Sequence, residues 1–125
     1  MTAGALNKIL ITLGEQAIGT NAKRYEAALL DGETVLAEYK TARDCLILTN
    51  KRVMSIDVQG LIGKKVEIFS LPYSKITAYS VETAGAFDLD AEFKVWASGL
   101  GIMEFKFIKG TDIAKVNKIL GSHTM

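Results

Sequence analysis

Residues 43–99 decide the fold and read RDCLILTNKRVMSIDVQGLIGKKVEIFSLPYSKITAYSVETAGAFDLDAEFKVWASG. At a strand period of two, this stretch divides into short pieces with apolar residues on both faces. Cys45 and Ile47, for example, alternate with Leu46 and Leu48. A strand in a small barrel needs only one buried face. The second apolar face therefore predicts a further partner, either another part of the chain or a second copy of it.

Seven strands are expected within this stretch and on either side of it. Glycines at positions 60 and 63, and at 99 and 101, mark hairpin turns, and Pro72 interrupts the hydrogen bonding between two runs. Short strands joined by such turns indicate an antiparallel barrel or sandwich. The expected strands are 33–40, 44–49, 52–58, 64–71, 75–83, 91–98 and 102–108.

The first 32 residues are predicted to be helical. Apolar residues at helical spacing favour a helix over residues 5–18, with Leu10 and Leu13 on its apolar face. A second short helix is expected to begin at Asn21 and to end near Gly32. The sequence thus predicts a helical extension over residues 1–32.

Residues 33–125 are expected to form a mainly β (α+β) unit that ends in a helix. Thr111 and Asp112 are favourable N-cap residues, and Gly121 is the predicted end of this helix. The one histidine, His123, is then expected in a frayed tail.

Composition narrows the class of protein. The 125 residues fit one domain, and 49% hydrophobic residues with a mean hydropathy of +0.20 are high for a small soluble monomer. No apolar run approaches the roughly 20 residues of a membrane-spanning helix, and the N-terminus lacks a basic segment before its apolar stretch. We therefore expect a cytoplasmic protein. A net charge of +1 predicts no nucleic-acid partner.

Three segments resemble the bacterial pleckstrin-homology-like (PH-like) family: ILTNKRVMSIDVQGLIGKKVEI, PYSKITAYSVETAG and FDLDAEFKVWASG. The likeness runs from about Glu33 to Leu120, and leading helices are also typical of that family. It implies a bent, nearly orthogonal seven-stranded antiparallel barrel capped by the last helix. It also implies homo-oligomers, often rings, but no particular ligand.

The surplus apolar residues are candidates for a homo-oligomer interface. If Phe93 and Val95 face the barrel core, the single tryptophan, Trp96, faces outward, and aromatic residues of this kind are enriched at interfaces. The second apolar faces of the strands expected at 44–49 and 52–58 also need a partner. The candidate interface residues are Trp96, Leu46, Leu48 and Val53. A second interpretation stays open, in which the N-terminal helices cover such residues within a monomer.

Basic residues at two turns are candidates for anion binding. PH domains that bind phosphoinositides cluster lysine and arginine at the first hairpin, where Lys40 and Arg43 stand here. Cys45 occupies the place expected for a second arginine, and Asp44 adds a negative charge, which disfavours phosphoinositide recognition. A weak anion site remains a candidate, with the residues Lys40, Arg43, Lys51 and Arg52.

A hairpin tip provides the membrane alternative. Leu61 and Ile62, flanked by Lys64 and Lys65, have the composition of a tip that enters a membrane interface while the lysines meet lipid headgroups. The other interpretation is that Leu61 and Ile62 fold back on the barrel or contact a neighbouring subunit.

No catalytic, metal or cofactor site is expected. Cys45 has no histidine near it in sequence and is expected to be a buried thiol, and no metal-binding, phosphate-binding or dinucleotide motif is present. We therefore expect a non-enzymatic interaction or scaffold module that acts as a homo-oligomer, for example a ring, with an unidentified protein as a further partner. The alternative is a peripheral protein that binds anionic lipid headgroups.

Overall fold

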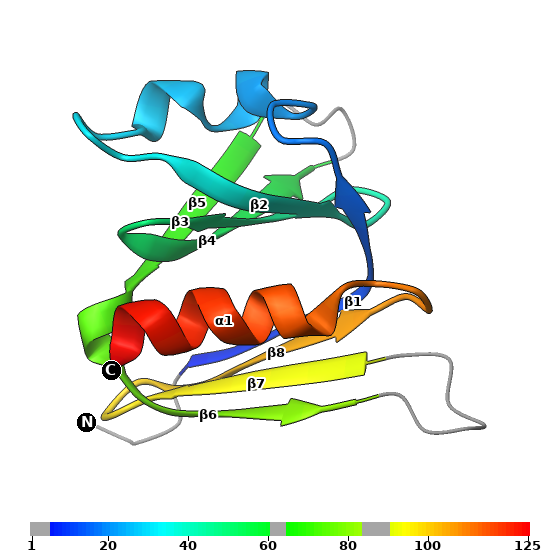
Figure 1. Cartoon of the computed structure of the whole chain (residues 1–125). Coiled ribbons are helices and arrows are strands. Elements are labelled where there is room, and N and C mark those ends of the chain that lie inside the picture. Colours follow the sequence, from blue (N-terminus) through cyan, green and yellow to red (C-terminus); the bar gives the residue numbers. More distant parts are fainter. Residues whose placement is uncertain (1–5, 61–64, 84–90) are drawn as a thin grey trace.

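Eight strands in the described residues form one continuous sheet that bends into two facing layers (Figure 1). The computed structural model describes residues 6–60, 65–83 and 91–125. The strand order is β5-β4-β3-β2-β1-β8-β7-β6, so β5 and β6 are the edges and the sheet is not closed. The strands are β1 (Leu6–Gln16), β2 (Val35–Lys40), β3 (Cys45–Thr49), β4 (Arg52–Gln59), β5 (Lys65–Pro72), β6 (Ile76–Glu82), β7 (Ala91–Ala97) and β8 (Gly101–Phe107).

The seven predicted strands correspond to β2 through β8, and the PH-like sandwich is confirmed. The eighth strand is β1, and here the predicted helix over residues 5–18 is wrong. The first part of β1 pairs in parallel with β8, and Gly14–Gln16 pair antiparallel with β2. The segment is therefore the strand that joins the two layers.

A bend in β1 explains why its sequence resembles a helix. The register with β8 shifts between Leu10 and Leu13, and Thr12 has a φ of 61°, a left-handed conformation that is rare for a β-branched residue. The irregularity turns both Leu10 and Leu13 into the core, although they are three positions apart. A spacing of three is the spacing of one helix face, so the bend imitates a helical pattern.

The second predicted helix is also shorter than expected. Residues 21–32 contain two 3-10 helices, Ala22–Arg24 and Glu26–Ala28, and a third such turn, Tyr73–Lys75, joins β5 to β6. A longer helix does not form because the segment lies over the sheet, where Asn21 and Tyr25 bond to a buried carboxylate described below.

The C-terminal helix, α1, runs over Ile113–Thr124. The predicted N-cap is confirmed, since the Asp112 side chain accepts a hydrogen bond of 3.1 Å from the backbone N–H of Lys115. Gly121 does not end the helix, and His123 belongs to it rather than to a frayed tail. The His123 ring stacks on Tyr73 with 5.0 Å between the ring centroids.

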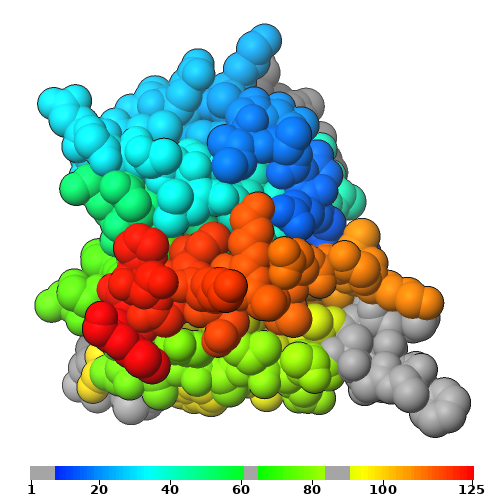
Figure 2. All heavy atoms as spheres, viewed as in Figure 1, coloured from blue at the N-terminus to red at the C-terminus, as the bar shows by residue number. Residues whose placement is uncertain are grey.

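The main core lies between the two layers and is closed by α1. Val116 and Leu120 of α1 are buried with residues of both layers, and the rings of Tyr39 (β2) and Phe107 (β8) meet edge to face at 5.0 Å. In the space-filling view, α1 separates the β2 layer from β6 as a continuous band (Figure 2).

A second, smaller core covers the outer face of β3 and β4. Tyr25 of the 3-10 segment is buried there together with Cys45, Ile47, Met54 and Ile56. Cys45 is a buried free thiol as predicted, and burial raises the pKa of this thiol. This half of the surplus apolar surface is thus covered within one chain.

Within the described residues, no helix has both the length and the apolar composition needed to cross a membrane.

Candidate interaction surfaces

The 3-10 segment is attached to β2 through one buried carboxylate. Glu38 is fully buried and accepts hydrogen bonds from the backbone N–H of Gly19 (2.9 Å), the backbone and side-chain amides of Asn21 (2.7 Å each) and the Tyr25 hydroxyl (2.5 Å). Burial opposes ionisation, but these donors outweigh it and lower the pKa of Glu38. Glu38 therefore acts as an anchor for the segment that covers the second core.

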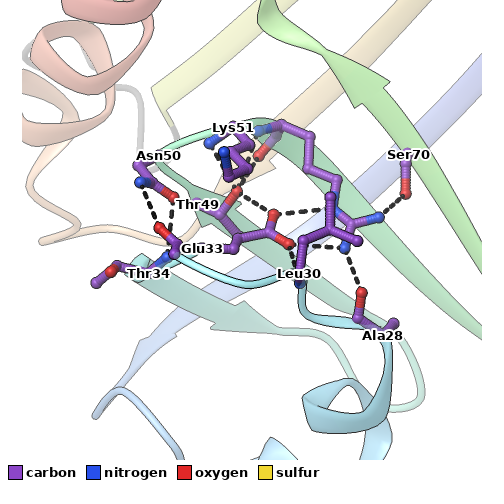
Figure 3. A network of polar contacts seen from close by, with 10 residues as sticks. Ala28, Leu30, Glu33, Thr34, Thr49, Asn50, Lys51 and Ser70 are labelled. Atoms are coloured by element: carbon purple, nitrogen blue, oxygen red, sulfur yellow. Dashed lines mark hydrogen bonds and ion pairs between the residues drawn. The ribbon is translucent and has the colours of Figure 1, made fainter.

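Arg52 forms a second anchor and is not a free cation. Its guanidinium binds both oxygens of Glu33 at 2.9 Å, the Ala28 carbonyl at 2.7 Å and the Ser70 hydroxyl at 2.8 Å (Figure 3). The Glu33 side chain is completely buried and that of Arg52 is 15% exposed. A paired, fork-like arginine of this kind has few donors left for an external anion.

The four basic candidates do not form one cluster. Lys40 ends β2 and Arg43 lies in the turn before β3, and Lys51 and Arg52 follow the end of β3. Because β3 has five residues, about 17 Å of strand separates the two pairs at roughly 3.4 Å per residue. Arg43 also donates to the Gly60 carbonyl at 2.5 Å. A single anion site made of all four residues is excluded by this separation.

The lipid-binding tip is only partly described. Leu61, Ile62 and Lys64 lie outside the described residues, while Lys65 is exposed at the start of β5, opposite Gln59. Membrane binding through this tip stays a prediction.

Three of the four candidate interface residues lie in the interior. Leu46, Leu48 and Val53 are at most 1% exposed and belong to the main core between the layers. Both faces of β3 and β4 are apolar because one faces the other layer and the other faces the 3-10 segment. A second copy of the chain has no access to these three residues in this structure.

Trp96 is the candidate that the structure leaves on the surface. It is 38% exposed on the outer face of β7, with Ala78 of β6 and Ile102 of β8 as its cross-strand neighbours. A surface depression of about 540 Å³ lies beside it, lined in part by Thr77 and Gly101.

Strand β1 adds two residues to this outer face that the sequence analysis missed. Ile9 and Ile11 are 52% and 55% exposed, and Ile9 pairs with Glu104 of β8. The run ILITL over residues 9–13 is rich in β-branched residues, which favour a strand as much as a helix. This run was the sequence signal from which the strand could have been predicted.

Charges on the same face are paired with one another. Lys94 lies 3.6 Å from Glu92 and 3.8 Å from Glu104, and Lys106 is the cross-strand neighbour of Glu92. We call the outward residues of β1 and β6–β8 the outer face: Ile9, Ile11, Ala78, Ser80, Glu82, Glu92, Lys94, Trp96, Ile102, Glu104 and Lys106. In the described residues no other element packs over this face, in contrast to the covered face of β3 and β4 (Figure 1).

Sequence relatives and solved structures agree with this architecture. The uncharacterised Bacillus subtilis (strain 168) protein YjqA is 46% identical over 99 residues, which are 78% of this chain and 79% of YjqA. A DUF1696 family protein with a pleckstrin-homology domain from Shewanella loihica PV-4 superimposes with a TM-score of 0.80 at 37% identity, covering 92% of this chain and 99% of that one.

A pleckstrin-homology domain from Shewanella amazonensis SB2B has a TM-score of 0.68 at 38% identity, covering 90% of this chain and 91% of its own. The family model described as "Bacterial PH domain" matches residues 4–124, nearly the whole chain. With the bent two-layer sheet and its capping helix, this match shows that the chain belongs to the bacterial PH domain family.

Proposed function

We propose that this protein is a non-enzymatic PH-like interaction module that self-associates through its outer face. The observation that carries the proposal is the exposed row around Trp96 on a sheet face that nothing in the described chain covers. Tryptophan is one of the residue types that dominate binding energy at protein interfaces. The family match and the curated relatives point to no enzymatic family.

A second copy is the occupant that the charges of this face favour. Three acidic residues, Glu82, Glu92 and Glu104, lie among two basic ones, Lys94 and Lys106, so the formal charge of the face is −1. Such a face is close to neutral, so two copies meet with little net repulsion and with a polar rim around an apolar centre. The chain as a whole carries a charge of only +1.

The open edges of the sheet favour a ring as the form of assembly. Strands β5 and β6 are unpaired at opposite ends of the strand order. If the outer face next to β6 meets a different surface of the next copy, the contact is head-to-tail, and such a contact forms a ring when the rotation between copies closes. Assembly in the cytoplasm agrees with a single reduced, buried cysteine.

Sedimentation velocity at tens of micromolar tests the proposal. We expect the wild-type chain to sediment as a multiple of 13.6 kDa and Trp96→Glu to shift it toward the monomer. Leu30→Glu is the matched control, because Leu30 is 59% exposed but lies outside the outer face. A monomeric wild-type protein, or equal effects of both substitutions, would contradict self-association through this face.

A further inference from the structure

A polar cavity opens between β1 and the inner face of β3 and β4, at the end of the sandwich near the β2–β3 hairpin. Its volume is about 240 Å³, and it is lined by Lys8, Ile9, Leu10, Asp44, Ser55 and Asp57. It shares only Ile9 with the outer face. The cavity is smaller than most drug-sized pockets and suits one short chain with a polar head.

Three carboxylates form a row across the strands, and two of them, Asp44 and Asp57, line this cavity. Asp57 of β4 is directly opposite Glu67 of β5, and the pairing of Cys45 with Ile56 places Asp44 beside Asp57 on the other side. Like charges directly opposite one another in a sheet are destabilising. Repulsion within the row therefore destabilises the sheet unless nearby cations balance the negative charges.

The cations near the row leave two of its members without an ion pair. The Lys8 ammonium of β1 is 3.0 Å from Glu67 and lies 5.2 Å from the centroid of the Phe69 ring. Among the described residues, no lysine or arginine comes within ion-pair distance of Asp44 or Asp57. Asp44 does accept a hydrogen bond of 3.2 Å from the backbone N–H of Val58.

Ser55 provides the second observation. The residue is only 3% exposed and lines the cavity, and its hydroxyl has no hydrogen-bond partner in the part of the chain that the structure describes. A serine hydroxyl can donate one hydrogen bond and accept two, so this one has capacity left for a group inside the cavity. It stands next to Asp57, two positions along the same strand face.

The ionisation of Asp44 agrees with a missing cation. Burial, the neighbouring charge of Asp57 and a side-chain hydrogen bond with Asp57 raise the pKa of Asp44, against the hydrogen bond from Val58 and the nearby Arg43 guanidinium. The other charged groups facing it are Lys8 on β1 and Glu67 on β5. A positive group placed between the two aspartates would relieve this repulsion.

We propose that the cavity binds a small organic cation, a primary ammonium or guanidinium on a short alkyl chain. The carboxylates of Asp44 and Asp57 and the Ser55 hydroxyl accept hydrogen bonds from its head, and Leu10 packs against its methylene groups. A metal ion suits the site less well, because no group of three or more ligating side chains is gathered for one in the described residues.

The test is an NMR titration of isotope-labelled protein with n-butylammonium at neutral pH and constant ionic strength, with n-butanol as the uncharged control. We expect saturable shifts of the Asp44, Ser55 and Asp57 amides with the ammonium alone. Asp57→Asn should weaken binding about tenfold, and Ser55→Ala about fivefold, the effects of losing a charged and a neutral hydrogen bond.

One control separates binding at this cavity from general attraction of cations to surface carboxylates. A second control separates two sources of the cation, a free amine and a lysine side chain of another protein. Asp31→Asn removes an exposed carboxylate elsewhere and should bind like the wild type. A blocked peptide containing one lysine indicates a protein side chain if it binds as tightly as butylammonium, and a free amine if it does not. Absence of saturable shifts, equal shifts with n-butanol, or equal weakening by Asp31→Asn would overturn the proposal.

Discussion

At the scale of single residues, Gly121 shows how a tertiary contact replaces a local rule. Glycine commonly ends helices, yet α1 continues past this position to Thr124. A Cβ at position 121 would lie 2.9 Å from the Tyr79 hydroxyl oxygen, on a ring that stacks on Phe93. The glycine is required for the close approach of α1 to β6, not for ending the helix.

This contact predicts whether alanine at position 121 raises or lowers the free energy of unfolding. Alanine in place of a helical glycine usually stabilises by about 1 kcal/mol, but Gly121→Ala should destabilise by roughly 1–3 kcal/mol because of the clash. Tyr79→Phe removes the hydroxyl oxygen and should restore most of the loss in the double variant. Urea unfolding measures all four proteins, and a stabilised Gly121→Ala single variant would refute the contact.

At the scale of elements, the segment between β1 and β2 is held by two buried acids. Glu38 anchors its first half to β2, and Glu33 joins its second half to Arg52 at the start of β4. Hydrogen bonds lower the pKa of both carboxyls despite burial, with Arg52 the main cause for Glu33 and Tyr25 for Glu38. The cover over the second core therefore depends on two ionised groups.

The lowered pKa values predict acid sensitivity. A carboxyl with a lowered pKa stabilises the fold above its ordinary value of 4.5, and this contribution is lost as pH falls through the lower, folded-state value. Asp44 affects stability in the opposite direction. Its pKa is raised, so the ionised carboxylate destabilises the fold and protonation at low pH removes this destabilisation. We expect the free energy of unfolding of the wild type to fall below about pH 4.5.

Glu38→Gln should be less stable at neutral pH, by about 1–3 kcal/mol for each donor left unpaired, and should lose less stability on acidification. Chemical unfolding at several pH values measures both effects. Glu26→Gln is the control, because the Glu26 side chain is exposed in the same segment. An unchanged pH slope in Glu38→Gln would show that Glu38 is not an anchor.

At the scale of the whole molecule, the two layers of the sheet differ in how many of their faces are buried. The layer of β2–β5 is covered on its inner face by the core and on its outer face by the 3-10 segment. In the described residues, the layer of β6–β8 with the first part of β1 is covered on its inner face alone. This asymmetry is what leaves Trp96 exposed.

Hydrogen exchange should report the asymmetry and its relief by assembly. Amides of the central strands β2 and β3 should exchange most slowly, and those of the edges β5 and β6 faster, because edge strands open more easily. If a second copy covers the outer face, amides of β6 and β7 should gain protection as the protein concentration rises, while those near Leu30 should not. Concentration-independent exchange throughout would count against self-association.

The strands β2 to β8 and the N-cap of α1 could be predicted because their signals are local. Alternation, paired glycines and Asp112 act within a few residues of the structure they produce. Strand β1 could not be predicted in this way, since the bend at Thr12 places Leu10 and Leu13 on one side and hides the strand period.

The sequence by itself determined a β sandwich with more apolar surface than one core needs, because periodicity and turn chemistry are encoded residue by residue, and the resemblance of three segments identified the sandwich as PH-like. Only the tertiary structure decided which of that surface is covered. Leu46, Leu48 and Cys45 are apolar residues of one strand that the sequence does not distinguish. They are buried by segments that are distant along the chain. Trp96 stays exposed for the same physical reason: in the described chain, no distant segment packs on its face.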